Sequence, residues 1–155
     1  MNLPFLETEA SLVRFIQEFE QGTLPRAQWT HAAHLTVAAW YLLTLPESEA
    51  IERVRTGIRH YNECAGTQNT PDSGYHETLT RFWLGIVGGF LAQSDGRAGR
   101  LEQARRVVRE FGDKRDLYRK YYSFDVVQSR PARREWVPPD RLGNAFGNKS
   151  RLVDI

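Results

Sequence analysis

The stretch "HAAHLTVAAWYLLTL", residues 31–45, is apolar on nearly every side of a helix and decides the fold. Thr30 precedes it as the expected N-cap, and Pro46 ends it. A helix that is apolar all round is normally buried at the centre of a protein. We therefore expect residues 31–45 to form a central helix against which the rest of the chain packs.

Five further segments flank this helix, and their apolar residues recur at helical spacing. For the first helix, Thr8 or Ser11 is the expected N-cap and Gly22 the expected end; for the fourth, Asp72 or Ser73 is the expected N-cap. No internal repeat, useful strand alternation or Gly-rich phosphate loop occurs, so we predict an all-α fold, a single-domain bundle of five to six helices. The flanking helices are expected over 8–21, 47–65, 75–93, 98–111 and 114–123.

The chain changes character after Ser123, where prolines and charges replace the helical periodicity. We expect an irregular C-terminal segment there, pinned to the helices by Arg133 or Arg134 together with Trp136. Terminal residues are the ones most often left loose. The prediction is one domain over 1–140 and a flexible tail over 141–155.

Composition narrows the function classes. The chain has 155 residues, enough for one core, and a net charge of +2, which gives no support for a nucleic-acid partner. Cys64 is the single cysteine, which points to a reducing compartment. No run of eighteen apolar residues and no signal-peptide pattern occurs, so we expect a cytoplasmic protein without membrane contact. The sequence is also compatible with a homodimer.

Three of the four histidines lie in the most apolar segments. His31 and His34 are three residues apart, which puts both imidazoles on one helix face, and His76 opens another apolar segment. Neutral imidazole binds divalent zinc, iron or nickel, and three histidines leave a position for water or substrate. Glu77 would then move a proton, so the leading hypothesis is a metal-dependent enzyme acting on a small molecule. Zinc would suit hydrolysis or hydration, and iron would suit oxygen chemistry.

Simpler interpretations stand beside this one. The histidines could form a buried hydrogen-bond network in a non-catalytic binding module for an apolar ligand or partner. Glu77 could pair with Arg81 at i,i+4 on the surface, or form a metal-free acid–base pair with His76. His60 and Glu63 also share a helix face, which is weaker ground for a metal site. For either kind of small-molecule site, the expected pocket residues are Trp29, Tyr75, Thr78 and Thr80.

Four motifs resemble a family of small bacterial proteins of uncharacterised function. They are W-T-H-A-A-H-L (29–35), G-Y-H-E-T-L-T-R-F-W (74–83), Y-Y-S (121–123) and A-R-R-E-W-V-P-P-D (132–140). The resemblance covers about residues 15–140, most of the chain. It implies that these segments belong to one compact unit, and it carries no activity, cofactor or catalytic residue with it.

Overall fold

The computed structural model describes residues 2–141. Over that range it is all-α, as predicted, with six α-helices, three 3₁₀ turns and no strand. The 3₁₀ turns are η1 (Pro4–Leu6), η2 (Arg26–Gln28) and η3 (Leu117–Lys120). The α-helices are α1 (Glu9–Gln21), α2 (His31–Thr44), α3 (Glu47–Cys64), α4 (Glu77–Ala92), α5 (Arg100–Phe111) and α6 (Arg130–Arg134). The predicted tail over 141–155 falls, apart from Arg141, outside the described residues.

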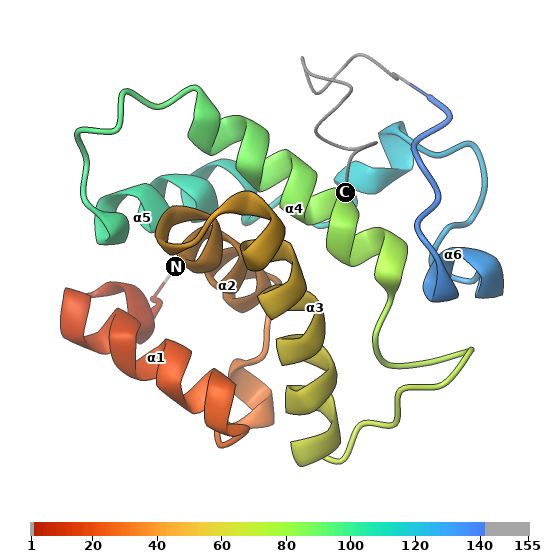
Figure 1. The fold of residues 1–155 in the computed structure, drawn as a ribbon, viewed down its shortest axis with the longest axis horizontal. Coiled ribbons are helices and arrows are strands. Elements are labelled where there is room, and N and C mark those ends of the chain that lie inside the picture. Colours follow the sequence, from red (N-terminus) through yellow and green to blue (C-terminus); the bar gives the residue numbers. More distant parts are fainter. Residues whose placement is uncertain (1, 142–155) are drawn as a thin grey trace.

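The apolar stretch forms the central helix, α2. It packs against α3, α4 and α5, and in Figure 1 it lies in the middle of the bundle. Thr30 is its N-cap, and the Thr30 hydroxyl accepts a hydrogen bond from the amide of Ala33. Small residues such as Ala33 and Ala39 are fully buried and let neighbouring helices come close. Helix α2 therefore positions the other helices, as its all-round apolar sequence predicts.

The outer helices α1 and α3 are amphipathic and begin and end at the expected signals. Thr8 and Ser11 form a capping box at the start of α1, and Gly22 ends α1 in the left-handed conformation. On α3, Ile58 and Tyr61 face the core, and the Tyr61 hydroxyl donates to the carbonyl of Leu24. These contacts join α1, the connector after it and α3 into one packed unit.

Helix α4 begins later than predicted. Its N-cap is His76, whose Nδ1 accepts a hydrogen bond from the amide of Leu79, so neither Asp72 nor Ser73 caps it. Asp72 instead forms a two-fold ion pair with Arg130. Imidazole is not among the usual N-cap side chains, which is why the sequence pattern misplaced this boundary.

The helix predicted over 114–123 is wrong. The chain forms only η3 there, and the segment then turns so that Tyr121 and Tyr122 reach a second apolar cluster beside Phe82 of α4. Both tyrosines are buried there, so tertiary packing rather than local helix preference sets the conformation of this segment. Helix α6, which was not predicted, lies within the irregular segment and is capped by Ser129.

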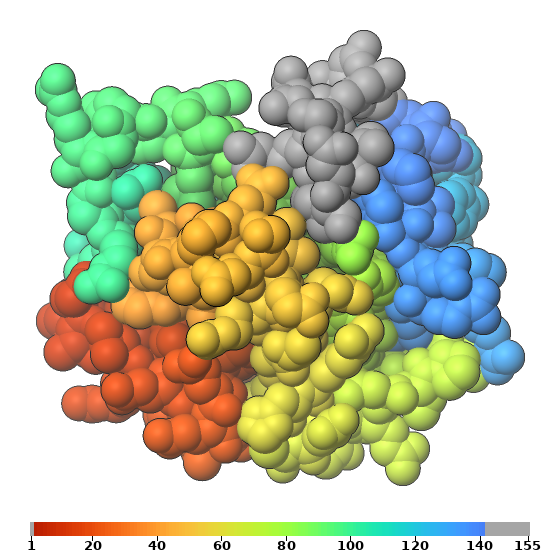
Figure 2. All heavy atoms as spheres, viewed as in Figure 1, coloured from red at the N-terminus to blue at the C-terminus, as the bar shows by residue number. Residues whose placement is uncertain are grey.

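The C-terminal segment folds back onto the helices, as expected from Arg133 and Trp136. The Arg133 guanidinium donates to the carbonyl oxygens of Gly74 and Val127, and Trp136 packs against the second apolar cluster. Figure 2 shows this segment, in blue, covering one side of the molecule beside the loop that precedes α4. No helix within residues 2–141 is long and apolar enough to span a membrane.

Candidate functional site

His31 and His34 lie on the first turn of α2, and each ring bonds a main-chain carbonyl. Nε2 of His31 donates to the oxygen of Phe111 at 3.1 Å, and Nδ1 of His34 donates to the oxygen of Thr30 at 2.8 Å. Because a carbonyl only accepts, the nitrogen facing it carries the proton. The opposite nitrogens, Nδ1 of His31 and Nε2 of His34, therefore keep their lone pairs.

Aromatic rings cover both histidines and keep them neutral. Trp29 lies 3.9 Å from the His34 ring, between ring centroids, and Trp83 meets the edge of His31 at 4.8 Å. Burial lowers the pKa of His34 from 6.5 to about 4, against the opposing effect of its hydrogen bond to Thr30. Burial also lowers the pKa of His31. Both rings are uncharged at neutral pH and available as acceptors.

His76 differs, because both of its ring nitrogens are engaged. Nε2 donates to the carbonyl of Val126 at 2.8 Å, and Nδ1 accepts from the amide of Leu79 at 3.2 Å. The ring is buried, and burial lowers the pKa of His76. No lone pair remains for a metal or for a proton from a substrate, so in this conformation His76 is a structural cap and tether.

The structure therefore does not bring His31, His34 and His76 together as a three-nitrogen site. Within residues 2–141, no group of three or more His, Cys, Asp or Glu side chains is placed to hold a metal ion. His60 and Glu63 share α3 as predicted, but the His60 ring lies next to the exposed Cys64 thiol at 3.6 Å. Of the three predicted metal ligands, only His31 and His34 keep a ring nitrogen with a free lone pair.

Glu77 is buried at the start of α4 and lies among three arginines. Its side chain is 4% exposed, and Oε1 accepts from Nε of Arg55 at 3.0 Å and from the Tyr75 hydroxyl at 2.6 Å. Arg81 Nε lies 2.8 Å from Oε2, and a terminal nitrogen of Arg59 lies 3.9 Å from Oε1. We call these five residues the Glu77 cluster. The Arg81 pair was predicted, but as a surface pair; in the structure the carboxylate is buried.

The environment of Glu77 keeps it ionised. Burial on its own raises the pKa of this carboxyl, but the hydrogen bonds from Tyr75 and Arg55 and the charges of Arg55 and Arg81 outweigh burial, so the net pKa is lowered from 4.5. A carboxylate held this firmly is a weak proton acceptor. The arrangement suits an electrostatic anchor between α3 and α4 better than the proton carrier predicted from sequence.

The four expected pocket residues make internal contacts. Trp29 contacts the rings of His34 and Tyr61 at a tilt, and Tyr75 is buried with its hydroxyl donating to Glu77. The hydroxyl of Thr78 donates to the carbonyl of Glu135 and accepts from the amide of Val137. Thr80 donates to the carbonyl of His76. All four side chains are therefore engaged in contacts within the protein, and Thr78 ties α4 to the C-terminal segment.

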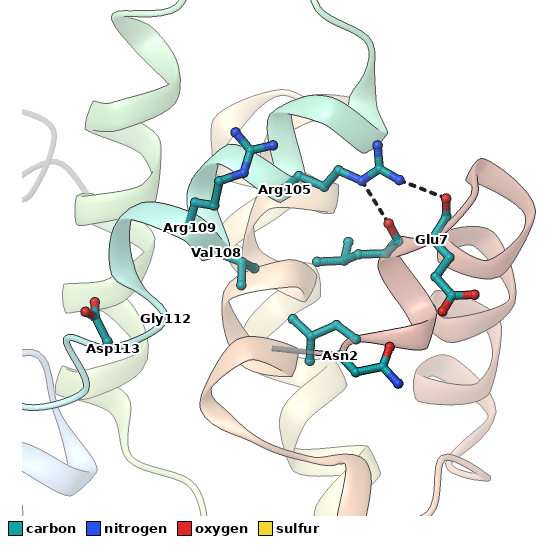
Figure 3. A pocket seen from close by; sticks show the side chains of 9 residues that line it. Asn2, Glu7, Arg105, Val108, Arg109, Gly112 and Asp113 are labelled. Carbon is teal, nitrogen blue, oxygen red and sulfur yellow. Dashed lines mark hydrogen bonds between the residues drawn. The ribbon is translucent and has the colours of Figure 1, made fainter.

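A pocket of about 540 Å³ lies elsewhere, between the N-terminal segment and α5. Such a volume is within the range of small-molecule sites, about 300–1,000 Å³. Leu3, Leu6 and Val108 supply its apolar lining. The remaining residues that line it are Asn2, Glu7, Arg105, Arg109, Gly112 and Asp113. Figure 3 shows both arginines extending along one side of the apolar side chains, with Asn2 on the opposite side.

Two interactions fix the walls of this pocket. Arg105 donates to the carbonyl oxygens of Leu6 and Glu7, at 2.8 Å each, which ties the N-terminal segment to α5 (Figure 3). The bond from His31 to the oxygen of Phe111 holds the end of α5, directly before the lining residue Gly112. Sequence patterns did not reveal the pocket, because its two walls are about a hundred residues apart in the chain.

Comparison with protein-family models, with curated proteins and with solved structures gave no match for this chain. The resemblance to small bacterial proteins stays a prediction from the motifs.

Proposed function

We propose that this protein is a non-catalytic helical binding module for a small, mostly apolar molecule. The observation that carries the proposal is the pocket between η1 and α5, whose lining combines Leu3, Leu6 and Val108 with a charged rim. A concave apolar surface with a few polar groups is the usual form of a small-molecule site. In this proposal the histidines are structural, and His31 supports the pocket by holding the end of α5.

The experiment uses anilinonaphthalene sulfonate, whose fluorescence rises when it binds an apolar surface. Octanol, octanoate and octylamine would then compete with the probe. The rim carries positive charge on Arg105 and Arg109 and negative charge on Glu7 and Asp113. The order in which the three competitors displace the probe therefore identifies the polar end that the site prefers. We expect octanol to displace the probe, since the apolar lining supplies most of the binding free energy.

Matched variants locate the binding. Leu3 and Leu45 are both half-buried leucines packed on the main core, but only Leu3 lines the pocket. Leu3→Ala should weaken octanol binding, and Leu45→Ala should not. Arg106→Gln is the control for Arg109→Gln, because both arginines contact Glu102 and only Arg109 lines the pocket. Equal effects of Leu3→Ala and Leu45→Ala would contradict the proposal.

A second candidate keeps part of the metal hypothesis. The lone pairs of His31 Nδ1 and His34 Nε2 are the observation that favours it, because neutral imidazole is a common ligand for divalent zinc, iron and nickel. Elemental analysis of protein purified without nickel resin tests it. Metal near one per chain that is lost in His34→Ala and kept in His76→Ala would support this candidate over the binding module.

A further inference from the structure

The Glu77 cluster carries more positive than negative charge. Arg55, Arg59 and Arg81 surround one buried carboxylate. Glu52 also pairs with Arg55, at 2.8 Å, and so compensates one guanidinium. Among the described residues, Arg59 and Arg81 have no carboxylate within ion-pair distance other than Glu77. Glu77 is therefore the one carboxylate that Arg59 on α3 and Arg81 on α4 share, and it also pairs with Arg55.

Arg81 is also poorly satisfied as a hydrogen-bond donor. Its side chain is only 15% exposed, and its Nε lies 2.8 Å from Glu77 Oε2. That contact is short but lacks hydrogen-bond geometry, and Nε is a buried nitrogen without a hydrogen-bond partner in the described part of the chain. A guanidinium has five N–H donors, and leaving a buried one unpaired is unfavourable. The Glu77 carboxylate therefore leaves the Arg81 guanidinium incompletely satisfied, and because Nε itself is buried, a ligand would meet the terminal nitrogens of Arg81.

Arg59 is held in place but remains accessible. Its guanidinium lies over the ring of Tyr75, 4.3 Å from the ring centroid, and its side chain is 43% exposed. Tyr75 is itself fixed by its hydrogen bond to Glu77. The stacking restricts the plane of the Arg59 guanidinium, which reduces the entropy lost when it binds a ligand.

We propose that Arg59 and Arg81 bind a phosphate group where α3 and α4 meet. Arg59 comes from α3 and Arg81 from α4, and both lie against the same Glu77 carboxylate. Guanidinium groups bind phosphate through charge-assisted hydrogen bonds, and a phosphate has more acceptor oxygens than a carboxylate, so one phosphate group can accept from both arginines. Glu77 positions both arginines, and the positive charge that remains after Glu52 and Glu77 are counted against the three guanidinium groups favours an anion at this place. This site shares no residue with the pocket beside α5, so the two proposals fail independently.

The test measures binding of inorganic phosphate by calorimetry, with chloride at the same ionic strength as the reference. We expect phosphate to bind where chloride does not, and Arg59→Gln to weaken it by about tenfold or more, since charge-assisted hydrogen bonds are the strong ones. Arg53→Gln is the control, because Arg53 is an exposed α3 arginine that pairs with Glu20 outside the cluster. Circular dichroism verifies that both variants fold.

Phenyl phosphate distinguishes the two sources of the ligand. If it binds as tightly as inorganic phosphate, the site takes the phosphate group of a larger molecule; if inorganic phosphate alone binds, the site takes the free ion. Either result supports the site. Arg81→Gln, where it folds, should also weaken binding. Equal affinity for phosphate and chloride, or equal losses in Arg59→Gln and Arg53→Gln, would overturn the proposal, because long-range charge would then explain the binding.

Discussion

Replacing Glu77 by glutamine should destabilise the protein far more than loss of a surface ion pair. The change removes the charge and leaves three arginines around a neutral amide. Removing one partner of a buried ion pair costs about 3–5 kcal/mol. Arg55 and Arg81 are 22% and 15% exposed, so water returns part of that loss, and we expect about 3 kcal/mol. In a chain of this size that lowers the melting temperature by about 6–12 °C.

Glu52→Gln is the matched control, because Glu52 contacts the same arginine, Arg55, at 2.8 Å but is 61% exposed. Exposed pairs contribute about 0–1 kcal/mol. Urea unfolding followed by far-UV circular dichroism at neutral pH measures both variants. If Glu77→Gln costs no more than Glu52→Gln, Glu77 does not anchor α3 to α4.

The pH dependence gives an independent check on Glu77. Its pKa in the folded protein is lowered from 4.5, so its contribution is complete above that value and is lost as the pH falls below it towards the folded pKa. The stability difference between the wild type and Glu77→Gln should therefore shrink in acid below 4.5. A difference that stays constant through that range would refute an ionised Glu77.

Three further changes test the histidine and C-terminal contacts. His34, with a folded pKa of about 4, should show an NMR titration midpoint near that value; because the unfolded chain takes up the proton first, its contribution to stability should decline as the pH falls from 6.5. A midpoint near 6.5 would contradict its burial. Thr78→Val should cost about 1–3 kcal/mol and speed hydrogen exchange of the Val137 amide, which loses its acceptor. Trp136→Ala should cost about 2 kcal/mol by urea unfolding, since the indole is only partly buried; an unchanged midpoint would mean that Trp136 does not hold this segment to the helices.

Local signals in the sequence predicted much of the bundle. The all-round apolar character of residues 31–45 identified the central helix, and Thr8, Thr30 and Gly22 marked helix ends because capping depends on neighbouring residues. The segment over 114–123 has helical spacing, but its conformation depends on where Tyr121 and Tyr122 are buried. That choice is made by tertiary packing, which overrides local preference.

The candidate site was less predictable, because its contacts are distant in sequence. Arg81 lies at i+4 from Glu77 and could be expected; Arg55 is 22 residues earlier, and no spacing rule links the two. His76 stands at the start of an apolar segment, and the carbonyl that its Nε2 bonds belongs to Val126, 50 residues later in the chain. The sequence therefore indicated which polar side chains lie in apolar segments, but not which distant groups form their hydrogen bonds and ion pairs.

The bonds from the start of α4 to the C-terminal segment also bear on how the chain is synthesised. His76 and Thr78 are buried, yet their carbonyl partners at Val126 and Glu135 are translated 50 and 57 residues later. On the ribosome, the first four helices therefore emerge with these polar groups still lacking their final partners. The N-terminal part of α4 should stay in exchange with solvent until residue 137 clears the exit tunnel, so an arrested nascent chain that ends before α6 should show fast hydrogen exchange there.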